Sequence, residues 1–363
     1  MKKLILALFT MIFVSTSIFA QADLQVLTVV KNGKNQTITV KDLKKRVAQI
    51  SKSEPNNVAI LKTVDGRKKA LETMIEETLI IQEAQKSGMS IPDSVVEQEL
   101  EMQFSQLIGS KVTVKQFEEL VKKQFNMSLD DFLIQNTGAN LKETKENLKN
   151  GILVNQYVFA INQEELKKIA PTDDQIRMFY EANKAGFVQK DMQKLFIVSI
   201  PKGSDANAAK TKLNQIKNKL ADKKTTTEKI VVQAEAENFQ AGDMLVQKDQ
   251  QSAMGIGMTM EQLLLLFTKP VGFISDIIDT PDAYQFFTIV KKYDAKMLSL
   301  SDLVQPETTV TVYDYIRMGL TQNLQMQYLN QAMQDLANKL NTPENVEMKK
   351  SDEAIEKLLN WGE

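Results

Sequence analysis

The chain has 363 residues, of which 43% are hydrophobic and 25% charged, and such a length suits about two domains. Its 45 basic and 46 acidic residues give a net charge of −1, so no overall basic field exists to attract nucleic acid. The sequence has no Cys and no His, which excludes disulfides, Cys or Ser–His nucleophiles and the ligands that hold most zinc, copper or haem. We therefore expect a binding protein rather than an enzyme, with no metal and no cofactor.

Residues 1–20 have the pattern of a secretory signal peptide. Two lysines precede an apolar stretch at residues 4–19, and the small residues Ala20 and Ala22 offer cleavage positions. A membrane anchor is the alternative, because the stretch approaches the length of a membrane span. Hydroxyl residues interrupt its apolar end, which favours cleavage near Ala20 or Ala22 and an exported protein without a stable membrane anchor. We expect no ATP-driven function, because no Gly-rich phosphate-binding loop ends in Lys-Ser or Lys-Thr.

The mature chain opens with a predicted hairpin. Residues 24–30 and 36–40 are strand-like and flank an Asn-Gly turn, which is a strong hairpin signal. Thr39 and Asp42 then have the spacing of a capping box, so a helix is predicted to begin there.

The rest of residues 21–170 is predicted to be helical. Apolar residues recur at helical spacing between Arg67 and Gly88, and the glycine is suited to the end of that helix. The further amphipathic helices are predicted at residues 93–108, 114–124, 129–137 and 141–168.

Residues 171–299 are predicted to form a small α+β domain. After a helix at 173–184, residues 195–200 are a near-continuous apolar run, which is typical of a central strand covered on both faces. An irregular stretch is expected from Gly242 onward. The other predicted elements are a helix at 205–221, a strand at 230–232, a short helix at 260–267 and a strand at 284–290.

The segment 300–363 contains a long amphipathic helix. Apolar residues form one stripe from Tyr313 to Leu340, and a helix of this length needs a partner surface. We expect it to pack back on the first domain. The predicted fold is therefore mainly α, with a discontinuous helical domain and an inserted small α+β domain.

Two segments of the first domain resemble the SurA-type periplasmic chaperones. Residues 26–43 contain Val-Leu-Thr-Val-Val-Lys-Asn-Gly and then Ile-Thr-Val-Lys-Asp-Leu, which is similar to the opening of that family. The helix at 67–88, followed by Met-Ser-Ile-Pro-Asp, is similar to the family's most recognisable helix. The resemblance implies a location in the periplasm.

Residues 188–298 resemble a parvulin-type prolyl isomerase domain, which SurA-like and PrsA-like foldases carry after the helical part. The resemblance depends on the first strand, on Gly242-Asp243, on Phe267 five residues before Gly272, and on the last strand. Active parvulins have a His in the first strand and another at the start of the last, where this chain has Phe196 and Gln285.

Other positions of the parvulin-like site also depart from the family pattern. Asp282 occupies a position where the family has a small hydroxyl-bearing residue. For Phe196 we expect plain core packing of a central strand rather than a functional role. The resemblance places a remnant of the proline pocket at Met258, Gln262 and Phe267, with Gln262 in place of an aromatic residue.

The resemblance implies an ATP-independent exported chaperone that binds unfolded secreted or outer-membrane proteins. The alternative is an active prolyl isomerase. That enzyme lowers a rotation barrier of about 18 to 20 kcal/mol without breaking a bond, so losing the imidazoles does not forbid activity. It does remove the hydrogen-bonding pair that organises the parvulin site, and we expect an inactive domain. A structural or adhesive exported protein is a third class, for which the sequence shows no repeats.

A chaperone of this kind needs apolar surface that adapts to many sequences, and methionine is suited to it because its side chain is flexible and polarizable. Ordinary core packing is the alternative for each apolar residue in the helical segments. The candidates for client binding are Met102, Phe104, Leu107, Phe117, Phe125, Phe132, Met318 and Met326.

Overall fold

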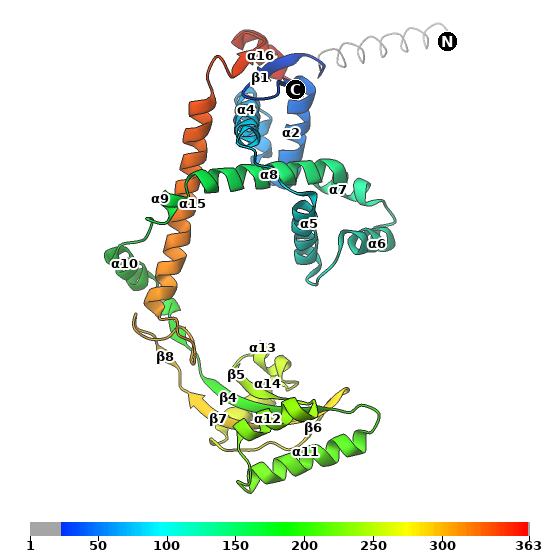
Figure 1. The fold of residues 1–363 in the computed structure, drawn as a ribbon, viewed down its shortest axis with the longest axis vertical. Helices are drawn as coiled ribbons and strands as arrows, with labels where there is room; N and C mark the ends of the chain where they lie inside the picture. Colours follow the sequence, from blue (N-terminus) through cyan, green and yellow to red (C-terminus); the bar gives the residue numbers. More distant parts are fainter. Residues whose placement is uncertain (1–22, 362–363) are drawn as a thin grey trace. The chain divides into compact units, whose positions relative to one another are not determined.

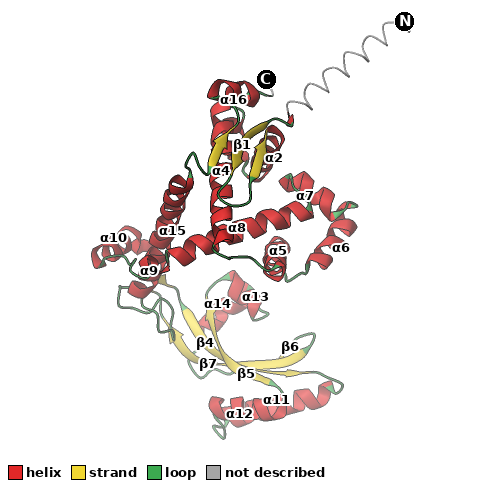
Figure 2. Ribbon diagram, turned by 45° about the horizontal axis from the view of Figure 1, so that its top comes forward, coloured by secondary structure: helices red, strands yellow, loops and turns green. Residues whose placement is uncertain are grey.

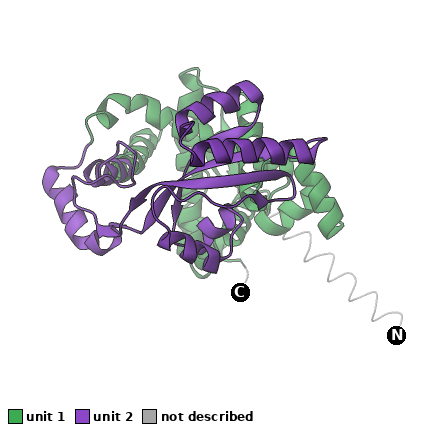
Figure 3. Ribbon diagram, turned by 90° about the horizontal axis from the view of Figure 1, so that it is seen from below, with its two compact units in different colours: residues 1–169, 323–363 green, residues 170–322 purple. Residues whose placement is uncertain are grey.

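The computed structural model describes residues 23–361, so the expected signal peptide and its cleavage positions lie outside the described residues. The chain divides into two compact units (Figure 3). Unit 1 consists of residues 1–169 and 323–363, and unit 2 consists of residues 170–322. Among the described residues, no helix has both the length and the apolar character needed to cross a membrane.

A three-stranded antiparallel sheet brings the two ends of unit 1 together. Strand β1 (Val26–Val30) pairs with β2 (Gln36–Thr39), which confirms the predicted hairpin. On its other side β1 pairs with β9 (Val346–Met348), so the order is β2-β1-β9. The first strand of the described chain is therefore the central strand, and the C-terminal segment supplies one of its neighbours.

Several helices of unit 1 begin at capping residues that the sequence shows. The Thr39 side chain caps α2 through a complete capping box with Asp42, and Thr113 caps α6 in the same way with Gln116. The expected helix at 141–168 is interrupted at Asn162. The helices are α2 (Val40–Ser53), α3 (Val58–Leu61), α4 (Val64–Lys86), α5 (Asp93–Ile108), α6 (Val114–Phe125), α7 (Leu129–Thr137), α8 (Leu141–Ile161), α9 (Gln163–Leu166) and α16 (Asp352–Leu359), with a 3₁₀ turn at Pro55–Asn57 (Figure 1).

The core of unit 1 contains residues from both ends of the chain. Ile355 and Leu359 of α16 are buried together with Leu27 of β1 and Leu43 of α2. The long helix α15 (Val312–Leu340) buries Ala337 in a second cluster with residues of α4 and α8. The helical domain is therefore discontinuous, which confirms the predicted fold class.

Unit 2 contains a four-stranded antiparallel sheet in the order β5-β4-β7-β6. Two predictions in this region are wrong. The expected strand at 230–232 is part of helix α12, because Thr226 caps that helix and Ile230 and Ala234 form its buried face. The expected irregular stretch after Gly242 is strand β5, which pairs along its whole length with β4. The strands are β4 (Met192–Pro201), β5 (Gln240–Gln247), β6 (Ile278–Asp279) and β7 (Ala283–Tyr293).

Helices cover both faces of this sheet (Figure 2). On one face Phe196 of β4 packs with Leu213 of α11 and Ile230 of α12. On the other face Leu195 of β4 packs with Leu263 of α14. Strand β4 is thus covered on both sides, as its apolar run predicts. The helices are α11 (Ala206–Ala221), α12 (Thr227–Glu237), α13 (Gln250–Gly255) and α14 (Met260–Thr268).

The rest of unit 2 surrounds the first turns of α15. Ile176 and Tyr180 of α10 (Asp173–Asn183) are buried with Leu298, Val312 and Ile316. Residues 300–322 are therefore part of unit 2. Short strands β3 (Val188–Gln189) and β8 (Lys296–Met297), preceded by a 3₁₀ turn at Lys184–Gly186, form a two-stranded ribbon between this cluster and the sheet.

Candidate functional site

A hollow of about 600 Å³ opens on one face of the unit 2 sheet. The register of β4 and β7 places Ser199 opposite Gln285 and Ile197 opposite Phe287, and these four side chains belong to its lining. The remaining lining residues are Gln240, Ala241, Gly242, Asp243, Met244, Met254, Gly255, Ile256, Gly257 and Thr280.

The structure separates the residues of the parvulin-like site that the sequence places together. Gln285 lines the hollow. Phe196 is 1% exposed and packs under α11 and α12 on the opposite face, so it has the core-packing role that the sequence favours. Side chains alternate along a strand, so β4 presents Ile197 and Ser199 at the hollow. Asp282 is exposed and outside the lining, and its carbonyl accepts a hydrogen bond from the Lys202 N–H at 2.9 Å.

The expected proline-pocket positions also lie outside the lining that the described residues form. Met258 and Phe267 are partly buried and pack against the core between α14 and the sheet. The Gln262 side chain is exposed, and its Oε1 accepts a hydrogen bond from the Thr259 N–H at 2.8 Å. Gln262 therefore completes the capping box of α14, whose N-cap is Thr259, and its spacing of three from Thr259 signals this role.

The polar side chains that line this hollow carry amide, hydroxyl and carboxylate groups. Gln285 and Ser199 offer an amide and a hydroxyl, which hydrogen-bond to a peptide backbone. The carboxylate of Asp243 pairs with Lys194 Nζ at 2.8 Å. The sequence does not single out Met244 and Met254, which are 42% and 65% exposed at the hollow. Both lie in the stretch after Gly242 that is expected to be irregular, whereas Met244 is on strand β5 and Met254 is on helix α13.

Unit 1 contains an apolar groove of about 600 Å³ between α8 and α15, which we call the methionine groove. Met326 is 61% exposed there and Phe159 is 49% exposed. The Tyr328 hydroxyl hydrogen-bonds to Asn162 at 3.1 Å and holds α15 beside the end of α8. The lining residues are Met89, Asn155, Gln156, Val158, Phe159, Ala160, Met326, Leu329, Asn330 and Met333.

The other candidates for client binding divide by exposure. Phe104 and Phe117 are buried, and their rings stack with centroids 4.0 Å apart, so both are core residues of the α5–α7 cluster rather than binding surface. Phe132 is partly buried against the same cluster. The candidates with exposed side chains are Met102, Leu107, Phe125 and Met318, in addition to Met326.

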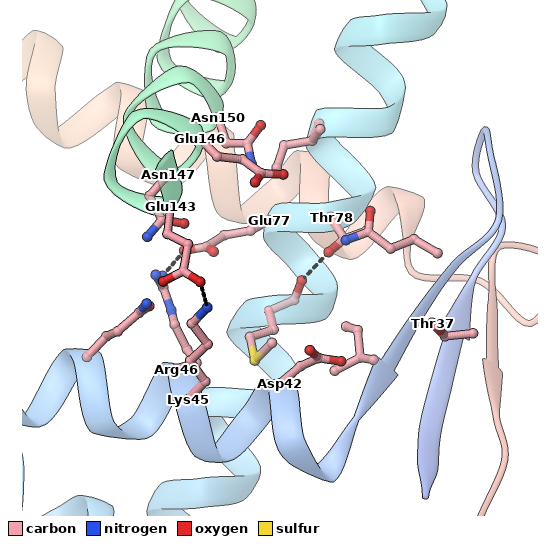
Figure 4. Close-up of a pocket in the computed structure, with 15 residues that line it drawn as sticks. Thr37, Asp42, Lys45, Arg46, Glu77, Thr78, Glu143, Glu146, Asn147 and Asn150 are labelled. Atoms are coloured by element: carbon pink, nitrogen blue, oxygen red, sulfur yellow. Dashed lines mark hydrogen bonds and ion pairs between the residues drawn. The ribbon is translucent and has the colours of Figure 1, made fainter. Parts of the chain in front are cut away.

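A third hollow, of about 290 Å³, is polar and lies between α2, α4 and α8 in unit 1 (Figure 4). Arg46 of α2 contacts Glu77 of α4 at 2.6 Å, and Lys45 pairs with Glu143 of α8. Burial raises the pKa of Glu77 although the Arg46 charge opposes this. These pairs connect three helices, and we assign them to the stability of unit 1.

Two family models match this chain in succession. A SurA-like N-terminal domain matches residues 1–158, and a PPIC-type PPIASE domain matches residues 171–303. A comparison with curated proteins finds no match.

Solved structures of chaperones and foldases are among the matches to this chain. One is from the pair of SurA-like chaperones PEB4 and Cj1289 of Campylobacter jejuni, with 17% identity over 90% of this chain and 99% of that chain, and a TM-score of 0.31. Another is the foldase PrsA of Streptococcus pneumoniae, with 14% identity over 89% and 95% and a TM-score of 0.27. PrsA of Bacillus subtilis is 16% identical over 94% and 100%, with a TM-score of 0.24. The two family models together describe most of the chain, which carries a SurA-like N-terminal domain followed by a PPIC-type prolyl isomerase domain.

Proposed function

We propose that this protein is an exported, ATP-independent chaperone that holds unfolded secreted or outer-membrane proteins in the periplasm. The observation that carries the proposal is the methionine groove of unit 1. An unfolded client presents apolar side chains in many different orders, so its binding site must adapt its shape. Flexible thioether side chains provide that adaptation, and Met89, Met326 and Met333 all line the groove.

The parvulin-like hollow of unit 2 is proposed as a second place for an extended client rather than as a catalytic centre. Gln285 and Ser199 can hydrogen-bond to a backbone, while Met244 and Met254 provide flexible apolar contacts. The rival function is an active prolyl isomerase, which the match to a PPIC-type domain favours. Such activity would require this hollow to hold a prolyl peptide in its twisted form.

The test measures binding of a permanently unfolded polypeptide and suppression of its aggregation. Met326→Ser together with Phe159→Ser makes the methionine groove polar, and we expect client affinity to fall by about tenfold. Met178→Ser is the matched control, because Met178 of α10 is 64% exposed but lies outside the groove. Equal affinity of the double variant and the parent would refute the groove as the client site.

The same samples distinguish the rival function through a proline-limited refolding reaction. A holdase suppresses aggregation near one-to-one stoichiometry and leaves the refolding rate unchanged. Acceleration at catalytic amounts, lost in Gln285→Ala, would instead establish an isomerase. Gln285→Ala is suited to this comparison because the Gln285 side chain is partly exposed in the hollow. The backbone pairing of β7 with β4 does not depend on that side chain, so we expect the sheet to be retained.

A further inference from the structure

A loop of unit 2 leads from the short strand β8 into the long helix α15. Its two sides approach each other, since Leu303 and Thr311 form an antiparallel bridge and the Val304 N–H donates to the Val310 carbonyl at 3.0 Å. Gln305 and Glu307 at its tip are exposed, as expected for a surface loop. We call this segment the 303–311 loop.

The tip of the 303–311 loop is attached to the four-stranded sheet through Glu307. Its carboxylate accepts a hydrogen bond from Lys194 Nζ of β4 at 2.7 Å and another from the Tyr293 hydroxyl of β7 at 2.6 Å. Lys194 also pairs with Asp243 of β5 at 2.8 Å. One loop side chain is thereby connected to three adjacent strands. The Lys194 side chain is 17% exposed, so water and salt screen its contacts less than those of an open surface pair.

The backbone at this contact has an uncommon conformation. Glu307 has a φ of +66°, in the left-handed region that side chains other than Gly, Asn and Asp rarely adopt. The neighbouring Pro306 is buried. Glu307 takes this conformation as the third residue of a β-turn that Pro306 enters and that the Thr308 N–H closes by donating to the Gln305 carbonyl at 3.3 Å. The turn presents the Glu307 side chain to Lys194 and Tyr293.

A short two-stranded ribbon connects the sheet to the start of α15. The ribbon of β3 and β8 has two residue pairs, Val188 with Met297 and Gln189 with Lys296. Beyond it, Val312 and Ile316 at the start of α15 are buried in the cluster that includes α10. A two-stranded ribbon is weak by itself, and short connections of this kind absorb hinge rotations.

We propose that the 303–311 loop is a releasable latch between the four-stranded sheet and the root of α15. While Glu307 holds Lys194 and Tyr293, the sheet has one orientation relative to the cluster around α10 and α15. When the contact is lost, the loop tip separates from the sheet and the sheet turns about the β3–β8 ribbon. This conformational device goes beyond the proposed chaperone function, and it acts wholly within unit 2.

The absence of cysteine from the chain makes a direct distance test possible. Ala182→Cys on α10 and Gln215→Cys on α11 place two spin labels at exposed positions on the two sides of the ribbon. In the parent we expect one narrow distance distribution from pulsed electron resonance. Glu307→Gln should broaden it, and amide exchange at Val304 should accelerate by about tenfold, because a charge-assisted hydrogen bond is replaced by weaker ones.

A second latch variant and a control complete the experiment. Lys194→Met keeps the length of the side chain and removes the charge, and it should broaden the distribution like Glu307→Gln. Glu237→Gln is the matched control, since Glu237 also accepts two contacts, from Lys212 at 2.9 Å and Gln233 at 3.0 Å, and these lie within the α11–α12 layer. We expect it to leave the distribution unchanged. Parent-like distributions and exchange rates in both latch variants would overturn the proposal.

Discussion

Glu347 lies on β9 between two lysines, and both contact its carboxylate. Lys31 directly follows β1, and Lys349 lies two residues after Glu347 in the chain. Hydrogen bonds from Lys31 and then from Lys349 lower the pKa of Glu347 to about 2. The folded-state pKa is thus below the ordinary value of 4.5, so the contact stabilises the fold above that pH and loses its contribution as the pH falls toward 2.

A titration of the Glu347 carboxyl carbon by nuclear magnetic resonance checks this assignment. We expect a midpoint near 2 in the parent and a midpoint closer to 4.5 in Lys31→Met, which removes the larger cause of the shift. Lys357→Met on α16 is the control, and it should leave the midpoint in place. A parent midpoint near 4.5 would contradict the role of the two lysines.

Gln262 has a local structural role that its spacing in the sequence indicates. Its spacing of three from Thr259 is the signature of a capping box, and the structure contains that box. The family resemblance assigns it a place in a proline pocket, and its side chain lies on α14 outside the lining of the unit 2 hollow. The local signal was sufficient, because capping depends on neighbours in the chain rather than on tertiary contacts.

Two elements near the C-terminus complete a fold that begins at the N-terminus. Strand β9 extends the hairpin sheet, and α16 buries Ile355 and Leu359 in the core with Leu27 and Leu43. Arg67 of α4 donates a hydrogen bond to the Leu359 carbonyl at 2.7 Å and lies 4.6 Å from the Trp361 ring centroid. The stability of unit 1 therefore depends on contacts between two of its segments that are far apart in the sequence.

Ile355→Ala tests this dependence at the scale of one helix. Ile355 is 4% exposed, and truncating a buried isoleucine costs about 2 to 5 kcal/mol of unfolding free energy. Trp361 is the single tryptophan of the chain and lies beside α16, so its fluorescence during denaturation by urea reports on this region. Lys357→Ala on the exposed side of the same helix is the control and should have little effect. A loss below about 1 kcal/mol for Ile355→Ala would contradict the structure.

The elements of the helical part could be predicted more completely than those of the sheet. Helix α5 at 93–108 and helix α7 at 129–137 have the predicted bounds, because their apolar period and their ends are local signals. Strand β5 was missed because it is an edge strand that contains Gly242 and Asp243, residues with low strand propensity. Pairing with β4 determines its conformation, and no pattern within the segment predicts that pairing.

At the scale of the whole molecule, the two compact units have separate cores. Phe196 belongs to a cluster of unit 2, whereas Trp361 packs against a cluster of unit 1. Units with separate cores can unfold in separate transitions, so a single unfolding free energy does not describe such a chain. The hollow of unit 2 and the methionine groove of unit 1 could not be predicted from the sequence, because each is lined by segments that tertiary contacts bring together.

Phe196→Ala provides the test of this separation. Phe196 is 1% exposed, so we expect the variant to destabilise unit 2 by about 3 to 5 kcal/mol. The part of the helical circular dichroism signal that unit 2 contributes should then be lost at lower urea concentration. The midpoint of the Trp361 fluorescence should stay at its parent value. An equal shift of both signals would show that the units unfold together.

The pairing of β1 with β9 has a consequence for the order in which the molecule forms. The Thr28 hydroxyl donates to the Glu347 carbonyl, 319 positions along the chain, so unit 1 cannot close before Glu347 has been synthesised. Unit 2 is a continuous stretch and has no such delay. During synthesis the helical part is therefore the part that stays incomplete for longest, with its apolar surfaces exposed to solvent. In that interval it is itself an unfolded polypeptide of the kind that it is proposed to bind.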